Sequence, residues 1–133
     1  KNENVFEKVK EITEGKGVTV VYDGVGKDTF NVSLECLDFR GLFVSFGQSS
    51  GMVPIVDLHK TFNPKSLYYT RPTLMHYTST RKELEESSNL LFTKIQNKEI
   101  KEHIFQTFNL KDAAKAHALI QSRQSTGSII LKP

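Results

Sequence analysis

The sequence predicts an α/β fold, in which a parallel sheet is flanked by helices, and three observations favour this class. The nearly continuous, β-branched apolar run at 18–22 is typical of a strand buried on both faces, as in a parallel sheet. Amphipathic helical spacing follows at 28–38 and a second apolar run at 42–46, so a strand, a helix and a strand fit in about thirty residues. The same alternation continues to the end of the chain, which favours a three-layer core.

A helix is predicted before the first strand, at 5–14. Apolar residues recur there at helical spacing, and Asn4 with Glu7 three residues later fits a helix cap. Gly15 stands where this helix would end.

The crossover helix at 28–38 carries an apolar stripe at positions one and two turns apart, Phe30, Leu34 and Leu37. Gly41 follows as the expected stop, and the strand at 42–46 completes a right-handed βαβ unit. We therefore expect the two strands of this unit to be near neighbours.

A loop of small residues at 47–51 leads into an irregular stretch that runs to Pro64. The third strand is predicted at 66–70, where Arg71-Pro72 ends it. Further on, Thr80 and Glu83 form a capping box for a helix that reaches about Asn97, with a predicted buried stripe of Leu84, Leu91 and Ile95.

The end of the chain predicts one more strand, helix and strand. Apolar and polar residues alternate at 104–108, and Ser128 to Leu131 form a closing strand. Between them, Asp112 is the expected cap of a helix that contains Ala116, Leu119 and Ile120.

Composition and charge exclude several classes of protein. With 38% hydrophobic and 25% charged residues, the 133-residue chain is typical of a soluble globular domain. Its net charge of +3 (18 basic minus 15 acidic residues) is dispersed, which argues against a nucleic-acid surface. No apolar stretch approaches the roughly 18 residues of a membrane span, so we expect no membrane partner. A single cysteine, Cys36, cannot form an internal disulfide, and we expect a cytoplasmic location.

Two glycine-rich segments follow neighbouring predicted strands, Gly24-Val25-Gly26 after the first and Phe46-Gly47-Gln48-Ser49-Ser50-Gly51 after the second. Ligands of open parallel sheets bind beyond the carboxyl ends of the strands, so these segments form a candidate binding edge. Glycines let a ligand approach the backbone, and the two serines offer hydroxyls to phosphate or ribose oxygens.

The dinucleotide fingerprint G-x-G-x-x-G is incomplete at this edge. Gly24 and Gly26 supply two glycines, but the third position is Thr29. On this pattern alone, a tight turn without a ligand is the better explanation of the glycine pair.

Other chemical candidates are weaker. The four histidines are dispersed, and none lies four residues from another or beside a cysteine pair, so no metal site is predicted. Cys36 lies in a predicted helix, where a small buried apolar residue is a better explanation than a nucleophile. Arg71 and Arg123 each follow a predicted element beside small polar residues, where a guanidinium could bind phosphate, although a surface arginine is the simpler explanation.

Four segments taken together resemble a known family: VVYDGVG (20–26), RGLFVSFGQSSG (40–51), SLYYTRP (66–72) and AHALIQSRQSTG (116–127). They are similar to the carboxyl-terminal part of NADPH:quinone oxidoreductases, the zinc-free, ζ-crystallin-like branch of the medium-chain dehydrogenase/reductase superfamily. The similarity extends over essentially the whole chain, in the right order.

The resemblance implies a cofactor, NADPH, and a set of residues that bind it: Gly24, Val25, Gly26, Phe46, Gly47, Gln48, Ser49, Arg71 and Arg123. Backbone groups of Val25 and Phe46 would face the nicotinamide carboxamide, and Gln48 replaces the asparagine expected in the family. No residue is implied as catalytic, and none as a metal ligand. The strand Ser66 to Thr70 would pair across a two-fold axis to form a homodimer.

The resemblance also implies a domain organisation. Residues 1–100 would form the second half of a Rossmann-type nucleotide-binding domain, and 101–133 the tail that returns to a catalytic domain. Because the chain begins at Lys1 without a methionine, we expect it to be a fragment of a longer parent. The fragment alone would then be inactive, because the phosphate-binding turn and the substrate wall lie elsewhere.

The implied activity is hydride transfer from NADPH to a quinone. Two alternatives remain at this level. A related zinc-free alkenal or enoyl reductase would use the same cofactor edge, and a free-standing nucleotide-binding or dimerisation module would use the edge without catalysis.

Overall fold

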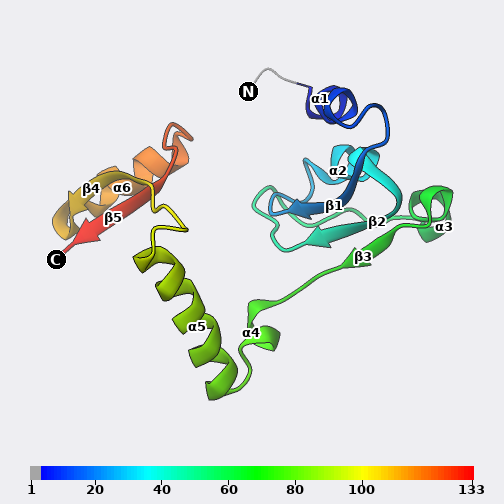
Figure 1. Ribbon diagram of the computed structural model, residues 1–133. Helices are drawn as coiled ribbons and strands as arrows, with labels where there is room; N and C mark the ends of the chain where they lie inside the picture. Colours follow the sequence, from blue (N-terminus) through cyan, green and yellow to red (C-terminus); the bar gives the residue numbers. More distant parts are fainter. Residues whose placement is uncertain (1–3) are drawn as a thin grey trace. The chain divides into compact units, whose positions relative to one another are not determined.

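The computed structural model of the chain describes residues 4–133 and divides into two compact units, Lys1–Ser79 and Thr80–Pro133. The first unit contains α1 (Val5–Ile12), β1 (Val18–Asp23), α2 (Phe30–Cys36), β2 (Leu37–Ser45), α3 (Leu58–Thr61), the 3-10 turn η1 (Asn63–Lys65), β3 (Tyr68–Thr70) and α4 (Leu74–Tyr77) (Figure 1). The second contains α5 (Arg81–Gln96), β4 (Ile104–Asn109), η2 (Leu110–Asp112), α6 (Ala113–Gln121) and β5 (Ser128–Lys132). The predicted α/β class is therefore confirmed.

The sheet of the first unit is parallel, in the order β1-β2-β3. Val21 lies beside Phe43, and Phe43 lies beside Tyr69, so the three strands share one register across the sheet. The predicted βαβ unit is confirmed, with its two strands as direct neighbours.

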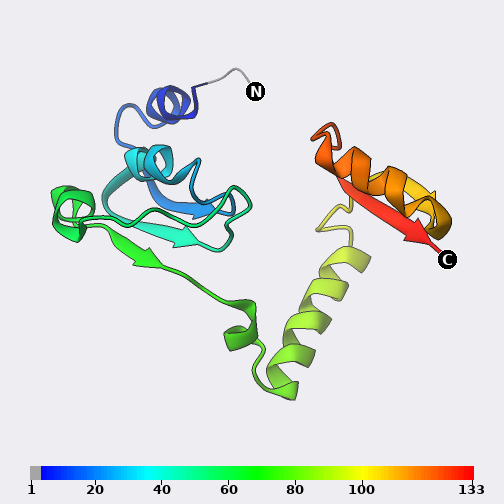
Figure 2. The same cartoon turned by 180° about the vertical axis from the view of Figure 1, so that it is seen from behind.

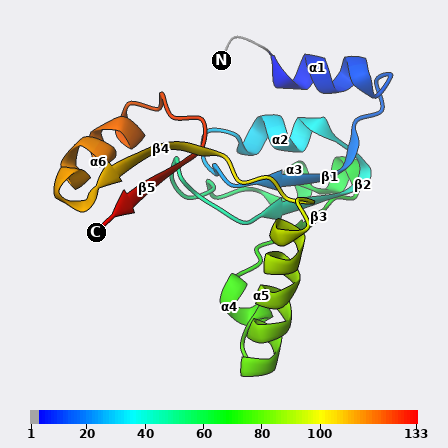
Figure 3. The same ribbon diagram turned by 60° about the vertical axis from the view of Figure 1, so that its left-hand side comes forward.

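Helices α1 and α2 lie on the same side of this sheet, which Figure 3 shows nearly edge-on. Successive residues of a strand point to opposite faces, so Val21 points toward the helices and Tyr22 points away from them. Tyr22 is 73% exposed and Val20 is 37% exposed. The prediction that the first strand is buried on both faces is therefore wrong, because in the described unit both long helices cover the same face.

The hydrophobic core lies under the α2 face. Phe30, Leu37 and Phe43 are at most 1% exposed, and half-buried residues of β1, α2 and the loop after β2 pack around them. Phe43 lies edge-on to Phe30, with ring centroids 5.4 Å apart, and stacks on Tyr69 at 5.7 Å. This aromatic column ties α2 to the middle and edge strands.

The crossover helix is shorter than predicted. It ends at Cys36, and Leu37 has extended backbone angles that begin β2 five residues before the predicted strand. The register jumps here, because Val18 pairs with Leu37 whereas Val20 pairs with Leu42. Gly41 therefore lies inside a bulged strand rather than at a helix end. Leu37 is fully buried as its spacing predicts, but the strand and not the helix carries it into the core.

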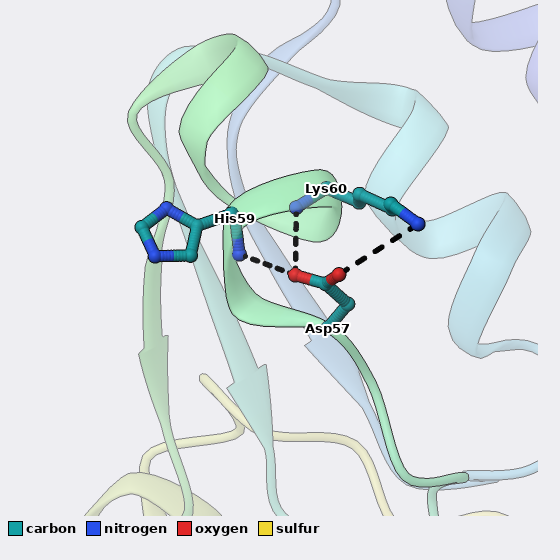
Figure 4. Close-up of polar contacts among 3 residues, drawn as sticks. All are labelled: Asp57, His59 and Lys60. Atoms are coloured by element: carbon teal, nitrogen blue, oxygen red, sulfur yellow. Dashed lines mark hydrogen bonds and ion pairs between the residues drawn. The ribbon is translucent and has the colours of Figure 1, made fainter.

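The stretch before β3, predicted to be irregular, contains two short helical turns. Asp57 caps the first of them, α3, because its Oδ1 accepts hydrogen bonds from the backbone amides of His59 (2.9 Å) and Lys60 (3.2 Å) (Figure 4). The second turn, η1, ends at Ser66, which has a left-handed backbone (φ 53°), so β3 begins two residues later than predicted.

At the N-terminal side, the cap of the first helix is confirmed. Asn4 accepts a hydrogen bond from the Glu7 amide, and the helix ends at Ile12, shortly before Gly15 with its positive φ.

In the second unit, β4 and β5 are parallel and α6 packs on them (Figure 2). The capping box of Thr80 and Glu83 at α5 is confirmed. The predicted buried stripe of α5 is wrong, since Leu84 is 45% and Leu91 47% exposed and Ile95 is only half-buried. No described element packs extensively along that side of α5.

Two further features qualify the sequence predictions. Asp112 stands at the start of α6 as predicted but makes no side-chain cap, because its carboxylate pairs with Lys115 instead. None of the helices within residues 4–133 is long and apolar enough to cross a membrane.

We predict that Phe43→Ala lowers the free energy of unfolding by about 3–5 kcal/mol, because it removes the central ring of the aromatic column and leaves a cavity. Phe39→Ala is the matched control on the same strand, where the ring is 69% exposed. We expect the control to change stability by less than about 0.5 kcal/mol. Urea unfolding followed by circular dichroism measures both, and equal losses would contradict the assigned core.

Candidate functional site

The carboxyl ends of the three parallel strands lie at one edge of the first unit. There the turn after β1 and the loop after β2 lie against each other, and Arg71 follows β3. Residues of the two glycine-rich segments, far apart in the chain, are thus brought together as the sequence predicts for a parallel sheet.

Asp23, the last residue of β1, is the buried anchor of this edge. Its side chain is 4% exposed, and it accepts hydrogen bonds from four groups of the turn and of α2: the amides of Val25 (2.8 Å) and Gly26 (2.9 Å) and the hydroxyls of Thr29 (2.8 Å) and Ser33 (2.8 Å). The carboxylate thereby fixes the course of the chain from the strand into the helix.

These bonds decide the ionisation of Asp23. Burial alone would raise the pKa of this carboxyl group, because it disfavours the charged form. The hydrogen bonds from Gly26, Thr29, Ser33 and Val25 stabilise the charge and hold the pKa below its ordinary value. Asp23 is therefore a buried, ionised structural carboxylate and not a proton donor near neutral pH.

The loop after β2 is tied to the same turn through the backbone. The Asp23 carbonyl accepts from the amides of Phe46 (3.0 Å) and Gly47 (3.3 Å), and the Gly24 carbonyl accepts from the amide of Ser49 (3.4 Å). The turn and the loop thus form one hydrogen-bonded body.

The glycines make this close approach possible. A Cβ on Gly47 would lie 2.4 Å from the Gly24 carbonyl oxygen, and one on Gly26 would lie 2.5 Å from the Gly51 carbonyl oxygen. Gly26 also has a φ of +90°, which disfavours other residues. A Cβ on Gly24 would lie 2.9 Å from the Cζ atom of the Phe46 ring. Loop packing alone therefore accounts for these glycines, whether or not a ligand binds.

Several predicted binding residues remain exposed along this edge: Val25, Phe46, Gln48, Ser49 and Arg71. The Phe46 ring is 56% exposed, and Arg71 donates to the carbonyl oxygen of Ser45 at 2.8 Å. The amides of Val25 and Phe46 already donate to Asp23, so a ligand at this edge would have to bind to other groups.

Two sequence candidates are placed differently. The hydroxyl of Ser50 donates to the Val25 carbonyl at 2.7 Å and accepts from the Asp28 amide at 3.0 Å, so it is engaged within the protein. Arg123 belongs to the second unit, where it follows α6 with a left-handed backbone (φ 56°).

Residues outside this edge offer little chemistry. Cys36 is 4% exposed, and burial followed by the nearby Glu35 charge raises the pKa of its thiol, so it remains a protonated apolar core residue. No three His, Cys, Asp or Glu side chains within residues 4–133 come together as a metal site. The ring of His59, for example, points away from Asp57 and Lys60 in Figure 4.

The sequence predicted that the two glycine-rich segments meet at this edge but missed the residue that anchors them. Asp23 was only the start of a glycine turn in the pattern, whereas in the structure it organises the whole edge. The available signal was an aspartate directly after an apolar strand, followed by hydroxyl residues at Thr29 and Ser33 that a turn and a first helical turn can bring back to it.

A parallel βαβ unit whose glycine loops meet at the carboxyl edge defines the class of Rossmann-type nucleotide-binding folds, here as one half of such a domain. The chain belongs to the zinc-binding dehydrogenase family, whose model matches residues 2–131. The described residues do not fit the zinc of that family description, because no ligand cluster is present among them.

Similar proteins agree with this assignment. Quinone oxidoreductase 1 of Escherichia coli is 50% identical over 100% of this chain, and 2-haloacrylate reductase of a Burkholderia species is 43% identical over 96% of it. The crystal structure of Escherichia coli quinone oxidoreductase complexed with NADPH has a TM-score of 0.90 and 51% identity, covering 99% of this chain. The resemblance to quinone oxidoreductases is therefore confirmed. The chain spans 41% of both Escherichia coli chains and 38% of the haloacrylate reductase.

We predict that Asp23→Asn lowers the free energy of unfolding by about 1–3 kcal/mol at neutral pH, because charge-assisted hydrogen bonds to buried donors are lost. Asp28→Asn, an exposed carboxylate at the same turn, is the matched control and should change stability by less than about 0.5 kcal/mol.

The loss should depend on pH with a definite sign. A lowered pKa means that the stabilisation by Asp23 is complete above about pH 4 and is lost as the pH falls through the lowered value. The stability difference between wild type and Asp23→Asn should therefore shrink in acid. Denaturant unfolding from pH 7 down to pH 3 measures it, and a difference that grows in acid would contradict the assigned ionisation.

Proposed function

We propose that this chain supplies the nicotinamide-end half of the NADPH site of an enzyme that reduces quinones. The observation that carries the proposal is the interlocked pair of glycine-rich loops at the carboxyl edge, in a chain that superposes closely on a quinone oxidoreductase solved with NADPH. The identities of 50% over the whole chain support the same activity for the parent.

The exposed groups of the edge fit the nicotinamide end of the cofactor. The Gln48 amide can both donate and accept, as a carboxamide requires. Arg71 is held by the Ser45 carbonyl and keeps further N–H donors for an oxygen of cofactor or substrate. Val25 and Phe46 offer apolar surface beside them. We propose that Gly24, Gly26 and Gly47 contribute by packing the loops, that Ser49 contributes its exposed hydroxyl, and that Arg123 is a further cofactor-binding residue of the parent.

NADPH supplies a hydride when it is bound, and the quinone gains that hydride and a proton to become a hydroquinone. The residues of this chain bind and orient, and we assign no acid, base or nucleophile among them. The anchored edge fixes the position of the ring-binding groups before the ligand arrives, which lowers the entropic cost of orientation.

A second candidate function is the reduction of a conjugated carbon–carbon double bond. The 43% identity to a 2-haloacrylate reductase favours it. Both reactions use the same hydride donor. The two enzymes would therefore share this cofactor-binding edge and differ in the residues that line the substrate-binding site. A panel of quinones and acrylates, tested on the longest protein that contains this chain, separates the two.

We also propose an organisation for the parent. Residues 1–100 would complete a Rossmann domain and 101–133 would return to a catalytic domain, in a cytoplasmic enzyme that uses the soluble cofactor. The 133-residue chain alone would then reduce quinones negligibly, since it would bring only part of the cofactor site.

We predict that reduced nicotinamide mononucleotide, but not 2′,5′-ADP, shifts the NMR amide signals of the edge, including those of Gln48 and Ser49, at millimolar concentration. The first ligand carries the half of NADPH that this edge should bind, and the second carries the other half. Arg71→Met should weaken the effect by about fivefold, as expected for the loss of a charged hydrogen bond, whereas Arg40→Met should not. Shifts by 2′,5′-ADP alone, or robust NADPH-dependent quinone turnover by the isolated chain, would contradict the half-site.

We further propose that the chain forms a homodimer through the outer edge of β3. The predicted light-scattering mass is then twice 15.1 kDa. Tyr68→Asp should return it to 15.1 kDa, because like charges would oppose each other across the two-fold axis. Tyr22→Asp, on the strand at the opposite side of the described sheet, is the control and should leave the dimer intact. Loss of the dimer in the control alone would place the interface on β1.

A further inference from the structure

We infer that Ser50 is a positioning residue: it clamps the loop after β2 onto the turn after β1 and so presets the edge where, if the proposed function holds, the nicotinamide end binds. The clamp residue neighbours the proposed binding residues Gln48 and Ser49 but is not itself one of them.

The side chain of Ser50 contacts two residues of the turn after β1, which lie 22 and 25 positions earlier in the sequence. Its hydroxyl donates to the Val25 carbonyl at 2.7 Å and accepts from the Asp28 amide at 3.0 Å. Its backbone amide donates to the same Val25 carbonyl at 2.9 Å. One residue therefore engages both an acceptor and a donor of the same turn.

The next residue extends the clamp. The Gly51 carbonyl accepts from the Lys27 amide at 3.1 Å, and Gly26 lies so close that a Cβ there would be 2.5 Å from the Gly51 oxygen. The two segments are thus in contact along their length, with the Ser50 side chain as the polar link between them.

The chemistry requires a hydroxyl at this position. A hydroxyl can donate one hydrogen bond and accept another at the same time, whereas alanine can do neither. Without it, the Asp28 amide loses its acceptor, and the Val25 carbonyl keeps only the backbone donor of Ser50. The loop would then be held by fewer hydrogen bonds next to Gln48 and Ser49.

Ser49 provides a matched control. It is the adjacent serine and is exposed, and its hydroxyl makes no hydrogen bond to any residue that the structure describes. A change at Ser49 can therefore remove a ligand contact but not the clamp.

The test compares Ser50→Ala, Ser50→Thr and Ser49→Ala in the 133-residue chain by amide hydrogen exchange and by titration with reduced nicotinamide mononucleotide. We expect the Asp28 amide to exchange about tenfold faster in Ser50→Ala, because its acceptor is gone. The same variant should bind the mononucleotide several-fold more weakly at a nearly unchanged unfolding midpoint. Ser50→Thr, which keeps the hydroxyl, should restore both values.

Ser49→Ala should leave the exchange of the Asp28 amide at the wild-type rate. Wild-type exchange in Ser50→Ala, equally fast exchange in Ser49→Ala, or no rescue by Ser50→Thr would overturn the clamp. If the wild-type chain exchanges as expected but does not respond to the mononucleotide, the clamp stands as a structural feature and its positioning role fails together with the proposed function.

Discussion

The carboxylate of Asp23 must find its hydrogen-bond donors inside the protein, because almost none of its surface reaches water. A buried charge without such partners would cost several kcal/mol. The chain meets this requirement by turning directly after β1, so that two amides and two hydroxyls converge on the carboxylate. The shape of the turn and the start of α2 follow from that constraint, and the backbone carbonyl of the same residue holds the second loop.

The consequence for function is an edge that is held by many internal hydrogen bonds and has no reactive side chain at its centre. Asp23 is ionised and enclosed, so it is not suited to proton transfer or attack on a substrate near neutral pH. What the edge presents outward is an amide at Gln48, a hydroxyl at Ser49, a guanidinium at Arg71 and the ring of Phe46. Such a surface agrees with the proposed role, in which the cofactor carries the reactive hydrogen and the protein supplies orientation.

The sequence predicted the parts of the fold that depend on local patterns. The apolar run of β1, the capping box at Thr80 and the alternation of strands and helices are local signals, and the structure confirms them. The end of α2 could not be predicted in this way, because Leu37 has the spacing of a helical stripe and yet enters the core from an extended strand. The exposed faces of β1 and α5 were also missed, since an apolar side chain in a sequence does not show whether a neighbouring element covers it.

The sequence could predict where the two glycine-rich loops lie, but not which contacts hold them together. Glycines after two strands indicate close packing, but only the structure shows that the loops pack on each other. The roles of Asp23 and Ser50 depend on bonds to residues up to 25 positions away, which no short motif records. The most direct measurement is the pKa of Asp23 in the folded chain, from the pH dependence of its carboxyl ¹³C signal. A value clearly below the roughly 3.9 of a free aspartate would support a buried, fully hydrogen-bonded carboxylate as the anchor of the edge. A value at or above that of a free aspartate would contradict it.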